Sequence, residues 1–304
     1  MTRSYIILGT TSITAAFARG LTSSNGRVPA IITTTAANRP NNSIDLKPVA
    51  TECGSIYHET DDLNDPRCLS LIRSLEPDFI ISSWPFMMKG DILHCARYGM
   101  IGSHPTKLPA NRGRHPLHWM ICLGITDSEL TFFRIQSADG VDNGPIIYRQ
   151  PFEVSPTIAK AVQAMDEAAA AAMEKLHRLL NENPTAPGKP QNEKAANVWR
   201  KRTENDIILD PRMSVEMICR TVASFAPPYP CAILRYREHS IRISLAERAP
   251  CAGSCRNAEY GRILSVDNNV ITMKVADGVV ALRGDVVPAD LTQGSCVHPP
   301  GYYD

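Results

Sequence analysis

The sequence has no long hydrophobic run, no large excess of charge of one sign and no internal repeat. Near the start, the apolar run at residues 5–8 is too short for the core of a signal peptide or for a membrane span, so we predict a cytoplasmic protein without a membrane partner. The 32 basic and 31 acidic side chains leave a formal net charge of +1, so no broad electric field attracts nucleic acid. A chain of 304 residues, 43% of them hydrophobic, is long enough for two globular domains.

Cysteine spacings typical of metal sites are also missing. The nine cysteines stand at positions 53, 68, 95, 122, 219, 231, 251, 255 and 296. This odd number without paired spacings predicts reduced thiols in the cytosol. Cys251 and Cys255 lack a second pair of ligands at suitable spacing, and His115 and His118 share a predicted helix with Trp119, which favours packing over ligation. No metal site is therefore expected.

Two common catalytic signatures are absent. Gly9, Thr10 and Thr11 follow the first predicted strand and resemble a phosphate-binding turn, but no G-x-G-x-x-G pattern follows and no acidic residue ends the second strand. The sequence thus disfavours a nicotinamide site. Ser82 and Ser83 lack the glycine-flanked elbow of a serine hydrolase.

Alternating strands and helices predict an α/β fold for the first 180 residues. Strands are expected at 4–9, 28–33, 79–83, 100–104, 130–135 and 145–150, and helices at 11–21, 45–54, 65–75, 91–96, 115–123 and 157–180. Because strand, helix and strand follow one another, we predict right-handed βαβ units and a parallel sheet. Residues 33–43 have no apolar period and are predicted to form an exposed loop.

A proline-rich stretch predicts the domain boundary. Residues 181–193 contain three prolines and no apolar period, which indicates a linker. We predict a catalytic domain at 1–185, a linker at 186–203 and a second domain at 204–304. The second domain has an expected helix at 214–224 and five short alternating strands, which predict a small β-barrel. These strands are expected at 231–237, 240–246, 260–266, 269–276 and 278–283.

Two segments at expected strand ends carry an imidazole and a carboxylate. The segment IGSHPTKLPANRG at 101–113 contains His104, and DGVDNGPII at 139–147 contains Asp142. In open α/β sheets, ligands bind where strands end at the carboxyl edge. A histidine can move a proton during attack on a carbonyl, and a neighbouring carboxylate fixes its tautomer, which is equipment for acyl transfer. The residues alone also leave open a core histidine with a satisfied ring and an ordinary turn aspartate.

A compact basic cluster lies beside this pair in the sequence. It consists of Lys107, Arg112 and Arg114. These side chains could hold a phosphate or carboxylate of a substrate, and a solvated basic loop is an equal alternative.

The two segments resemble the folate-dependent formyltransferase superfamily, which includes methionyl-tRNA formyltransferase, glycinamide ribonucleotide transformylase and sugar N-formyltransferases. The positions that fall on the family pattern are His104, Leu108, Pro109, Arg112, Gly113, Asp142 and Gly144. LGTTSITAAFARGL, LKPVATECGSIYHETDDLND and KRTENDIILD followed by SFAPPYPCAI extend the resemblance along the chain. It implies a Rossmann-like formyltransferase domain with a parallel-rich sheet and a smaller C-terminal OB-like barrel.

The resemblance also implies the site. The formyl donor would be 10-formyltetrahydrofolate, with His104 and Asp142 as the catalytic pair. The pteridine would lie against Trp84, Phe86, Met87 and Met88 and the backbone of Ser137, Ala138, Asp139 and Gly140. The residues expected to bind the acceptor are Gly9, Thr10, Thr11, Lys107, Asn111, Arg112 and Arg114.

One position departs from the family pattern. The family's asparagine falls on Gly102, two residues before His104 and on the same face of the strand, so its side-chain donor is absent. Loss of one oxyanion donor can cost about 10²–10³ in rate. Ser103 faces the other way in a regular strand, which leaves a water, Asn111 or the doubly protonated His104 as candidate donors.

These features predict an N-formyltransferase that acts on a small amine, such as a nucleotide-linked amino sugar. A tRNA acceptor would require a basic loop to hold its phosphates, but residues 33–45, TTTAANRPNNSID, contain a single arginine. Methionyl-tRNA formyltransferase, a formyltetrahydrofolate hydrolase and a catalytically impaired folate-binding protein remain alternatives. The C-terminal barrel is expected to be an accessory or dimerising module, and a homodimer is one state that we consider.

Overall fold

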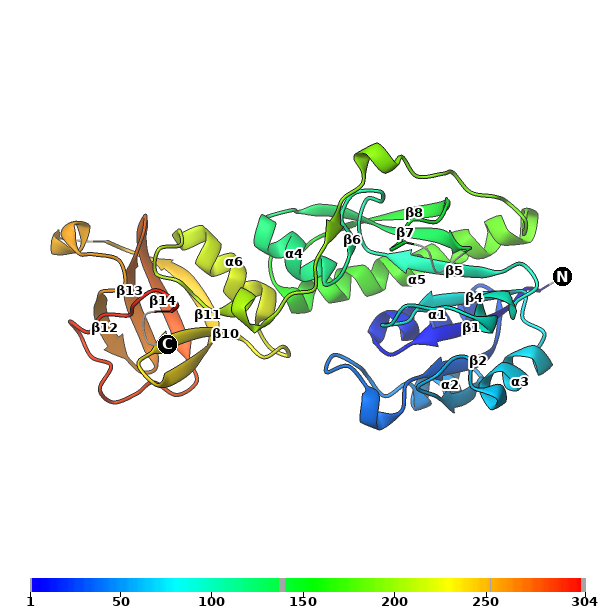
Figure 1. Cartoon of the computed structure of the whole chain (residues 1–304), viewed down its shortest axis with the longest axis horizontal. Coiled ribbons are helices and arrows are strands. Elements are labelled where there is room, and N and C mark those ends of the chain that lie inside the picture. The colour runs from blue at the N-terminus through cyan, green and yellow to red at the C-terminus, as the bar shows by residue number, and fades with distance from the viewer. Residues whose placement is uncertain (1, 137–139, 252, 302–304) are drawn as a thin grey trace. The chain divides into compact units, whose positions relative to one another are not determined.

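In the computed structural model, which describes residues 2–136, 140–251 and 253–301, the chain divides into two compact units (Figure 1). The first comprises Met1–Pro116, Asp127–Glu153 and Gln163–Trp199, and the second Leu117–Thr126, Val154–Val162 and Arg200–Asp304. The domain limits predicted from the sequence stay a prediction. None of the helices in the described part of the chain combines the length and the apolar character that a membrane span requires.

The first unit is built on a seven-stranded mixed sheet with the order β3-β2-β1-β4-β5-β7-β8. Its strands are β1 (Ser4–Gly9), β2 (Arg27–Thr33), β3 (Ile56–Glu59), β4 (Phe79–Ser83), β5 (Met100–His104), β7 (Asp127–Ile135) and β8 (Ile146–Glu153). The strands from β3 to β5 pair in parallel, whereas β7 is antiparallel to both β5 and β8. Every residue of β1 is buried, as expected for an inner strand covered on both faces. The predicted parallel-rich α/β sheet is confirmed.

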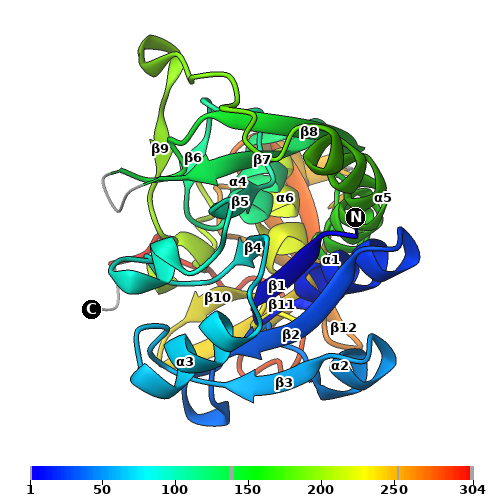
Figure 2. The same cartoon turned by 90° about the vertical axis from the view of Figure 1, so that its right-hand side faces the viewer.

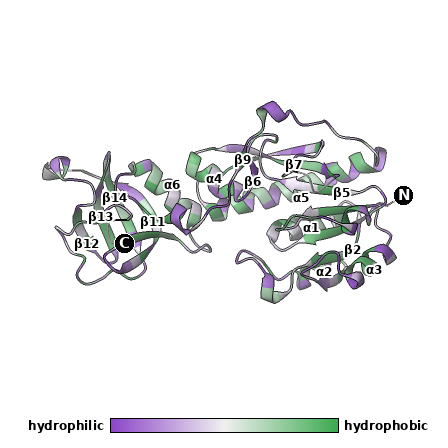
Figure 3. Ribbon diagram, in the orientation of Figure 1, coloured by the Kyte–Doolittle hydropathy of each residue, from purple (hydrophilic) through white to green (hydrophobic). Residues whose placement is uncertain are grey.

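Helices cover both faces of this sheet, as Figure 2 shows. They are α1 (Ser12–Ser23), α2 (Lys47–Glu52), α3 (Pro66–Ser74) and α5 (Ile158–Glu182), with short 3-10 turns η1 (Ala36–Asn38) and η2 (Asp91–His94). On the face of α1 and α5, Tyr5 shares a hydrogen bond of 2.8 Å with His177, and Phe17 packs on Phe132. On the other face, residues of α3 and η2 close a second hydrophobic core with alternate residues of the strands. Hydrophobic residues accordingly follow the strands in Figure 3.

Some elements differ from the sequence prediction. Strand β3 was not expected, and the helix predicted at 91–96 is only the 3-10 turn η2. The segment predicted as a linker contains the 3-10 turn η3 (Glu193–Ala195) and the short strand β9 (Val198–Trp199). Strand β9 pairs in parallel with β6 (Arg112–Gly113), so this segment lies beside the loop that follows β5 (Figure 2).

The second unit contains a five-stranded antiparallel sheet with the order β10-β11-β14-β13-β12. The strands are β10 (Ala232–Tyr236), β11 (His239–Ala249), β12 (Ile263–Asp267), β13 (Val270–Val275) and β14 (Gly278–Gly284), and all five were predicted. The remaining elements are α4 (Pro116–Leu123), α6 (Val215–Phe225) and the 3-10 turns η4 (Glu204–Ile207) and η5 (Gly253–Asn257). Inward-facing residues of the sheet and of α6 form one hydrophobic core.

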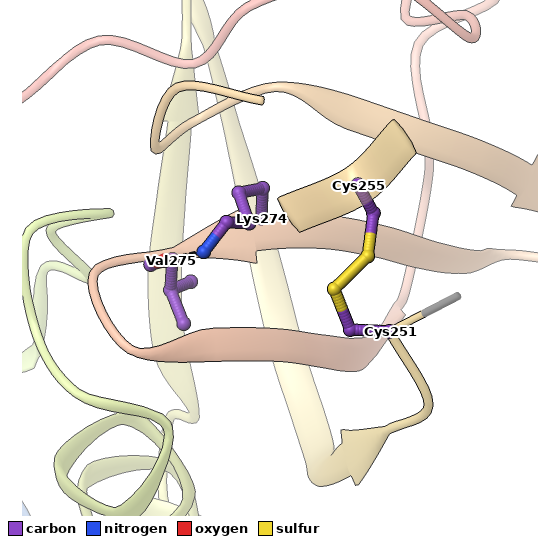
Figure 4. Close-up of a disulfide and its surroundings, with 4 residues drawn as sticks. All are labelled: Cys251, Cys255, Lys274 and Val275. Carbon is purple, nitrogen blue, oxygen red and sulfur yellow. Dashed lines mark hydrogen bonds between the residues drawn. A yellow bond between two sulfur atoms is a disulfide. The ribbon is translucent and has the colours of Figure 1, made fainter. Parts of the chain in front are cut away.

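The second unit also contains a disulfide bond, between Cys251 and Cys255 (Figure 4). Nearby in this view, the Lys274 ammonium donates a hydrogen bond of 3.0 Å to the carbonyl oxygen of Val275. The prediction that all the cysteines are reduced is wrong for this pair. The Cα atoms of Cys251 and Cys255 lie 5.9 Å apart, a distance that a disulfide spans. The spacing of the cysteines in the sequence does not reveal this distance.

Candidate active site

His104 is the last residue of β5 and is almost completely buried, with 5% of its surface exposed. Its Nε2 lies 2.8 Å from the carbonyl oxygen of Asn111, and its Nδ1 lies 3.4 Å from Oδ2 of Asp142. Both neighbours are hydrogen-bond acceptors. A neutral ring can donate to only one of them, whereas an imidazolium can donate to both. The two acceptors therefore fix the orientation of the ring, with each nitrogen facing an oxygen of the protein.

Asp142 lies in the loop that leads into β8, with a φ of +48°. Its Oδ2 accepts a hydrogen bond of 3.0 Å from the backbone N–H of Gly113, so one carboxylate oxygen faces both this amide and His104. This loop is held tightly against β7, because a Cβ atom at Gly144 would lie 1.7 Å from the carbonyl oxygen of Arg134. Only glycine fits there. The Asp142 side chain is 21% exposed against 6% for His104, so it presents the pair to solvent.

A glutamine that the sequence analysis did not single out joins the two loops of this pair. Gln191 donates from Nε2 to the carbonyl oxygens of Asp142 at 2.7 Å and Gly144 at 2.8 Å. Its Oε1 accepts hydrogen bonds from Nε and Nη2 of Arg112, at 3.1 and 2.7 Å. Glu193 completes the shell of Arg112 with two further hydrogen bonds of 2.9 and 2.7 Å. No sequence pattern identifies Gln191, since its partners lie 47 to 79 residues away.

The predicted basic cluster is not a set of free cations. Lys107 is ion-paired with Asp127, and the buried Arg112 is occupied as described above. Arg114 donates from Nη1 to the carbonyl oxygen of Pro85 at 2.8 Å, so it supports the loop after β4. Arg112 is therefore not a solvated cation, whereas the side chain of Lys107 stays 49% exposed in its ion pair with Asp127.

The loop after β4 exposes two large apolar side chains. Phe86 is 50% and Met87 60% exposed, whereas Trp84 and Met88 pack against the hydrophobic core on the α3 face of the sheet. Ser82 fixes this loop, because its hydroxyl accepts from the Trp84 N–H at 3.2 Å and lies 3.3 Å from Sδ of Met88.

Gly102 lies on the same face of β5 as His104 and pairs with Phe133 of β7. A Cβ atom at this position would lie 2.6 Å from Cζ and 2.9 Å from Cε2 of the Phe133 ring. The ring therefore occupies the space into which a side chain at residue 102 would extend. Ser103 faces the opposite side, and its hydroxyl lies 3.4 Å from the carbonyl oxygen of Ser82.

The remaining predicted residues lie at the end of β1, at the start of α1 and ahead of β8 in the sequence, and their binding roles stay predictions. Gly9 lies close to Thr14 and Ser83, since a Cβ atom there would lie 2.2 and 2.3 Å from their hydroxyl oxygens, and the Thr10 carbonyl accepts from the Ile44 N–H. Thr11 caps α1 through its backbone, without a side-chain cap hydrogen bond. Gly140 has a φ of +97°. Ser137, Ala138 and Asp139 lie outside the described residues.

His118, one of the two histidines considered as metal ligands, is engaged in packing contacts. His118 packs between the rings of Phe225 and Tyr229, at centroid distances of 4.5 and 4.7 Å, and its Nδ1 lies 2.6 Å from the carbonyl oxygen of Ser224. Across residues 2–136, 140–251 and 253–301, no group of three or more potential ligands gathers around one point.

The fold and the site define an α/β protein with an imidazole and carboxylate pair at the carboxyl edge of its sheet. Residues 3–178 match the family described as formyl transferase, and the chain belongs to this family. The resemblance seen in the sequence is thereby confirmed at the level of the family.

Solved structures of low sequence identity share the fold. Methionyl-tRNA formyltransferase from Clostridium thermocellum has a TM-score of 0.59 at 15% identity, over 91% of this chain and 100% of that one. An N-formyltransferase from Helicobacter canadensis, in complex with folinic acid and dTDP-3-aminofucose, has a TM-score of 0.62 at 14% identity, over 93% and 100%. HypX from Aquifex aeolicus, in complex with tetrahydrofolic acid, has a TM-score of 0.59 at 16% identity, over 91% of this chain. The present chain spans only 43% of HypX.

Proposed function

We propose that the protein is an N-formyltransferase that moves a formyl group from 10-formyltetrahydrofolate to the amine of a small substrate. One observation carries the proposal. Within a formyl transferase family chain, the sequence-predicted His104 and Asp142 lie 3.4 Å apart at the carboxyl edge of the sheet. An imidazole and a carboxylate in this relation can accept and return a proton during acyl transfer.

The loop after β4 supports a folate as the formyl donor. The half-exposed side chains of Phe86 and Met87 offer an apolar surface that a planar pteridine ring would cover. The structures of HypX and of the Helicobacter canadensis enzyme contain tetrahydrofolic acid and folinic acid, respectively, which supports the same assignment. The bound folate would supply the formyl group.

In the proposed reaction, the neutral amine attacks the formyl carbon, a new C–N bond forms, and the bond from this carbon to N10 of the folate breaks. The proton that the amine loses passes to the pair of His104 and Asp142, and the pair returns a proton to N10. Tetrahydrofolate and the formamide are the products. Asp142, which is the more exposed of the two, would meet the substrate side, and His104 would hold the proton in the buried interior.

The oxyanion of the tetrahedral intermediate requires a donor other than a side chain at residue 102. We propose the side-chain amide of Asn111, because both ring nitrogens of His104 already face acceptors in Asn111 and Asp142. Both backbone groups of Asn111 are already engaged, its N–H with Asn197 at 2.8 Å and its carbonyl oxygen with His104 at 2.8 Å. Only its side chain is left for a ligand in this arrangement.

We propose a small acceptor, such as a nucleotide-linked amino sugar, rather than tRNA. The single arginine of the loop after β2, Arg39, is paired with Glu59 and donates to Tyr57, so it is not available for phosphates. The dTDP-3-aminofucose in the Helicobacter canadensis structure supports an amino sugar. An OB-like barrel in the C-terminal unit, a homodimer and a cytoplasmic location remain parts of this proposal.

The experiment that tests the proposal measures tetrahydrofolate release from 10-formyltetrahydrofolate, with and without candidate amino sugars. Release that depends on the amine is expected. Release without an amine would instead identify a hydrolase. No release would contradict both enzymes and would favour a catalytically impaired folate-binding protein, the alternative that the missing side chain at Gly102 motivates. His104→Ala should abolish turnover and retain folate binding, whereas His94→Ala, at an exposed histidine, serves as the matched control.

A further inference from the structure

Gln191 is bonded at both ends of its side-chain amide to the two loops that carry the candidate catalytic pair. Its NH₂ group holds the carbonyl oxygens of Asp142 and Gly144, and its oxygen holds the guanidinium of Arg112. The Nε2 group of Gln191 therefore makes two hydrogen bonds as donor, and its Oε1 makes two as acceptor. The residue lies between two backbone contacts of its own segment, the hydrogen bonds of Lys189 with Ile146 and the pairing of β9 with β6, so its side chain extends from an anchored stretch of chain.

We call the hydrogen bonds that the Gln191 side chain makes to the two loops the Gln191 bridge. This bridge acts on Asp142 from two directions. On one side, Gln191 fixes the backbone of the loop at Asp142 itself, whose φ of +48° is unfavourable for a residue other than glycine. On the other side, it fixes Arg112, and the next residue along the chain, Gly113, donates its N–H to Oδ2 of Asp142. The Gln191 side chain thus contacts both of the loops whose separation brings the Asp142 carboxylate to this amide.

The rest of the segment from residue 189 to residue 199 holds the bridge in place. Lys189 exchanges two backbone hydrogen bonds of 2.8 Å with Ile146 at the start of β8. Asn197 accepts from the Asn111 N–H at 2.8 Å, and its carbonyl oxygen accepts from the Arg112 N–H at 3.0 Å. The hydrogen bonds with Arg112 also lower the pKa of Glu193, so this carboxylate stays ionised beside the guanidinium.

We propose that Gln191 is a positioning residue for the pair of His104 and Asp142, a role that rests on the proposed function. It does not touch the reacting atoms. It holds the loop at Asp142 and the loop of residues 105–113 at the separation at which Oδ2 of Asp142 faces His104. Displacement of a catalytic group by about 1 Å can cost about 10²-fold in rate, so a loss of this bridge should appear in kcat.

Two variants at residue 191 separate its contacts with Arg112 from its contacts with the carbonyl oxygens of Asp142 and Gly144. Gln191→Met retains the length and much of the volume of the side chain but removes all its hydrogen bonds. Gln191→Glu retains the acceptor for Arg112 but replaces the donor to the two carbonyl oxygens with a second acceptor. Gln163→Ala is the matched control, because this exposed glutamine of α5 bonds only to the neighbouring turn of its own helix, at Glu167.

We expect both variants at residue 191 to lower kcat by about 10- to 100-fold with an essentially unchanged KM for 10-formyltetrahydrofolate. Gln191→Glu should keep its pair with Arg112, and the melting temperature of each variant is measured beside its activity. Activity equal to that of Gln163→Ala, a change confined to KM, or a fall no larger than the loss of folded protein would overturn the proposal.

Amide hydrogen exchange tests the bridge without any turnover. In the wild type, the Gly113 N–H is bonded to Asp142 and should exchange slowly. In Gln191→Met, this amide should exchange faster while the amides of β1 keep their protection. Faster exchange in a protein that proves to be inactive would refute the proposed function but not the bridge, whereas unchanged exchange at Gly113 would refute the bridge.

Discussion

Asp166 of α5 has a buried carboxylate that the proposed chemistry does not use. Its side chain accepts a hydrogen bond from Ser12 at the start of α1, and within the described residues its Oδ1 is buried without a hydrogen-bond partner. Burial raises the pKa of Asp166 from 3.8 to about 6, against a smaller opposing effect of the Ser12 hydrogen bond. The folded protein thus holds this proton more tightly than the unfolded chain does, so the contribution of Asp166 to stability is complete below pH 4 and is lost as the pH rises through 6.

Asp166→Asn should therefore stabilise the protein at neutral pH. The side chain loses the charge that burial disfavours and can still accept from Ser12. Because the Asp166 side chain is only partly buried, we expect a gain of only about 1 kcal/mol in the free energy of unfolding at pH 7. Urea unfolding at pH 5 and at pH 7.5 measures the effect, which should be larger at the higher pH. Glu167→Gln, at the exposed neighbouring position, should show no such gain, and an equal gain at both pH values would contradict the explanation.

Among the secondary-structure elements, those with a clear apolar pattern were predicted best. The buried runs of β1, β4 and β5 stand out in the sequence, and all five strands of the C-terminal sheet follow from their alternation. Strand β3 was missed because its residues, IYHE, are all exposed or half-buried and present no apolar face. The two-residue strands β6 and β9 arise from a long-range pairing, which no local pattern encodes.

The candidate site was predictable only where one residue type stood at a strand end. The strand-end pattern singled out His104 and Asp142, the family resemblance implied their role as a catalytic pair, and the structure brings Nδ1 of His104 within 3.4 Å of Oδ2 of Asp142. Gln191 was not found, because an isolated glutamine in a proline-rich stretch is typical of a linker. The ion pair between Lys107 and Asp127 was missed for a different reason. Asp127 lies 20 residues further along the chain, and no local pattern connects the two residues.

The pairing of β5 with β7 makes a testable connection between Gly102 and Phe133. A Cβ atom at residue 102 would overlap the tip of the Phe133 ring, so Gly102→Ala should lower the free energy of unfolding by about 1–3 kcal/mol. In a Phe133→Leu background the same change should cost clearly less, because the shorter side chain vacates this space. Chemical denaturation of the four proteins measures the coupling. Phe152→Leu, at a buried phenylalanine of β8, is the control background, and an identical cost in all backgrounds would refute the overlap.

For the whole molecule, the near balance of charge is the main electrostatic property. A net charge of +1 provides no general attraction for a polyanion, and the pairing of Arg39 removes the one cation of the loop at residues 33–45. This balance distinguishes a small acceptor from a tRNA, whose binding depends on many phosphate contacts.

The activity should accordingly depend weakly on salt. Between about 50 and about 200 mM salt, kcat/KM for the acceptor should change by less than about tenfold, whereas a protein with 6–10 phosphate contacts loses about 10³–10⁵ in affinity over this range. Initial rates at several concentrations of a monovalent salt, measured with an amino-sugar acceptor, give the slope. A steep decrease would favour an acceptor held by many phosphates and would contradict the small-amine assignment.

The segment of residues 189–199, which carries Gln191, comes late in the order in which the protein is synthesised. A ribosome completes His104 and Asp142 well before it reaches Gln191, Glu193 and Asn197. A nascent chain that stopped at residue 185 would contain both members of the pair but none of the side chains that join their loops. Translation therefore finishes the site only after residue 199, and any shortened version intended for activity should extend at least that far.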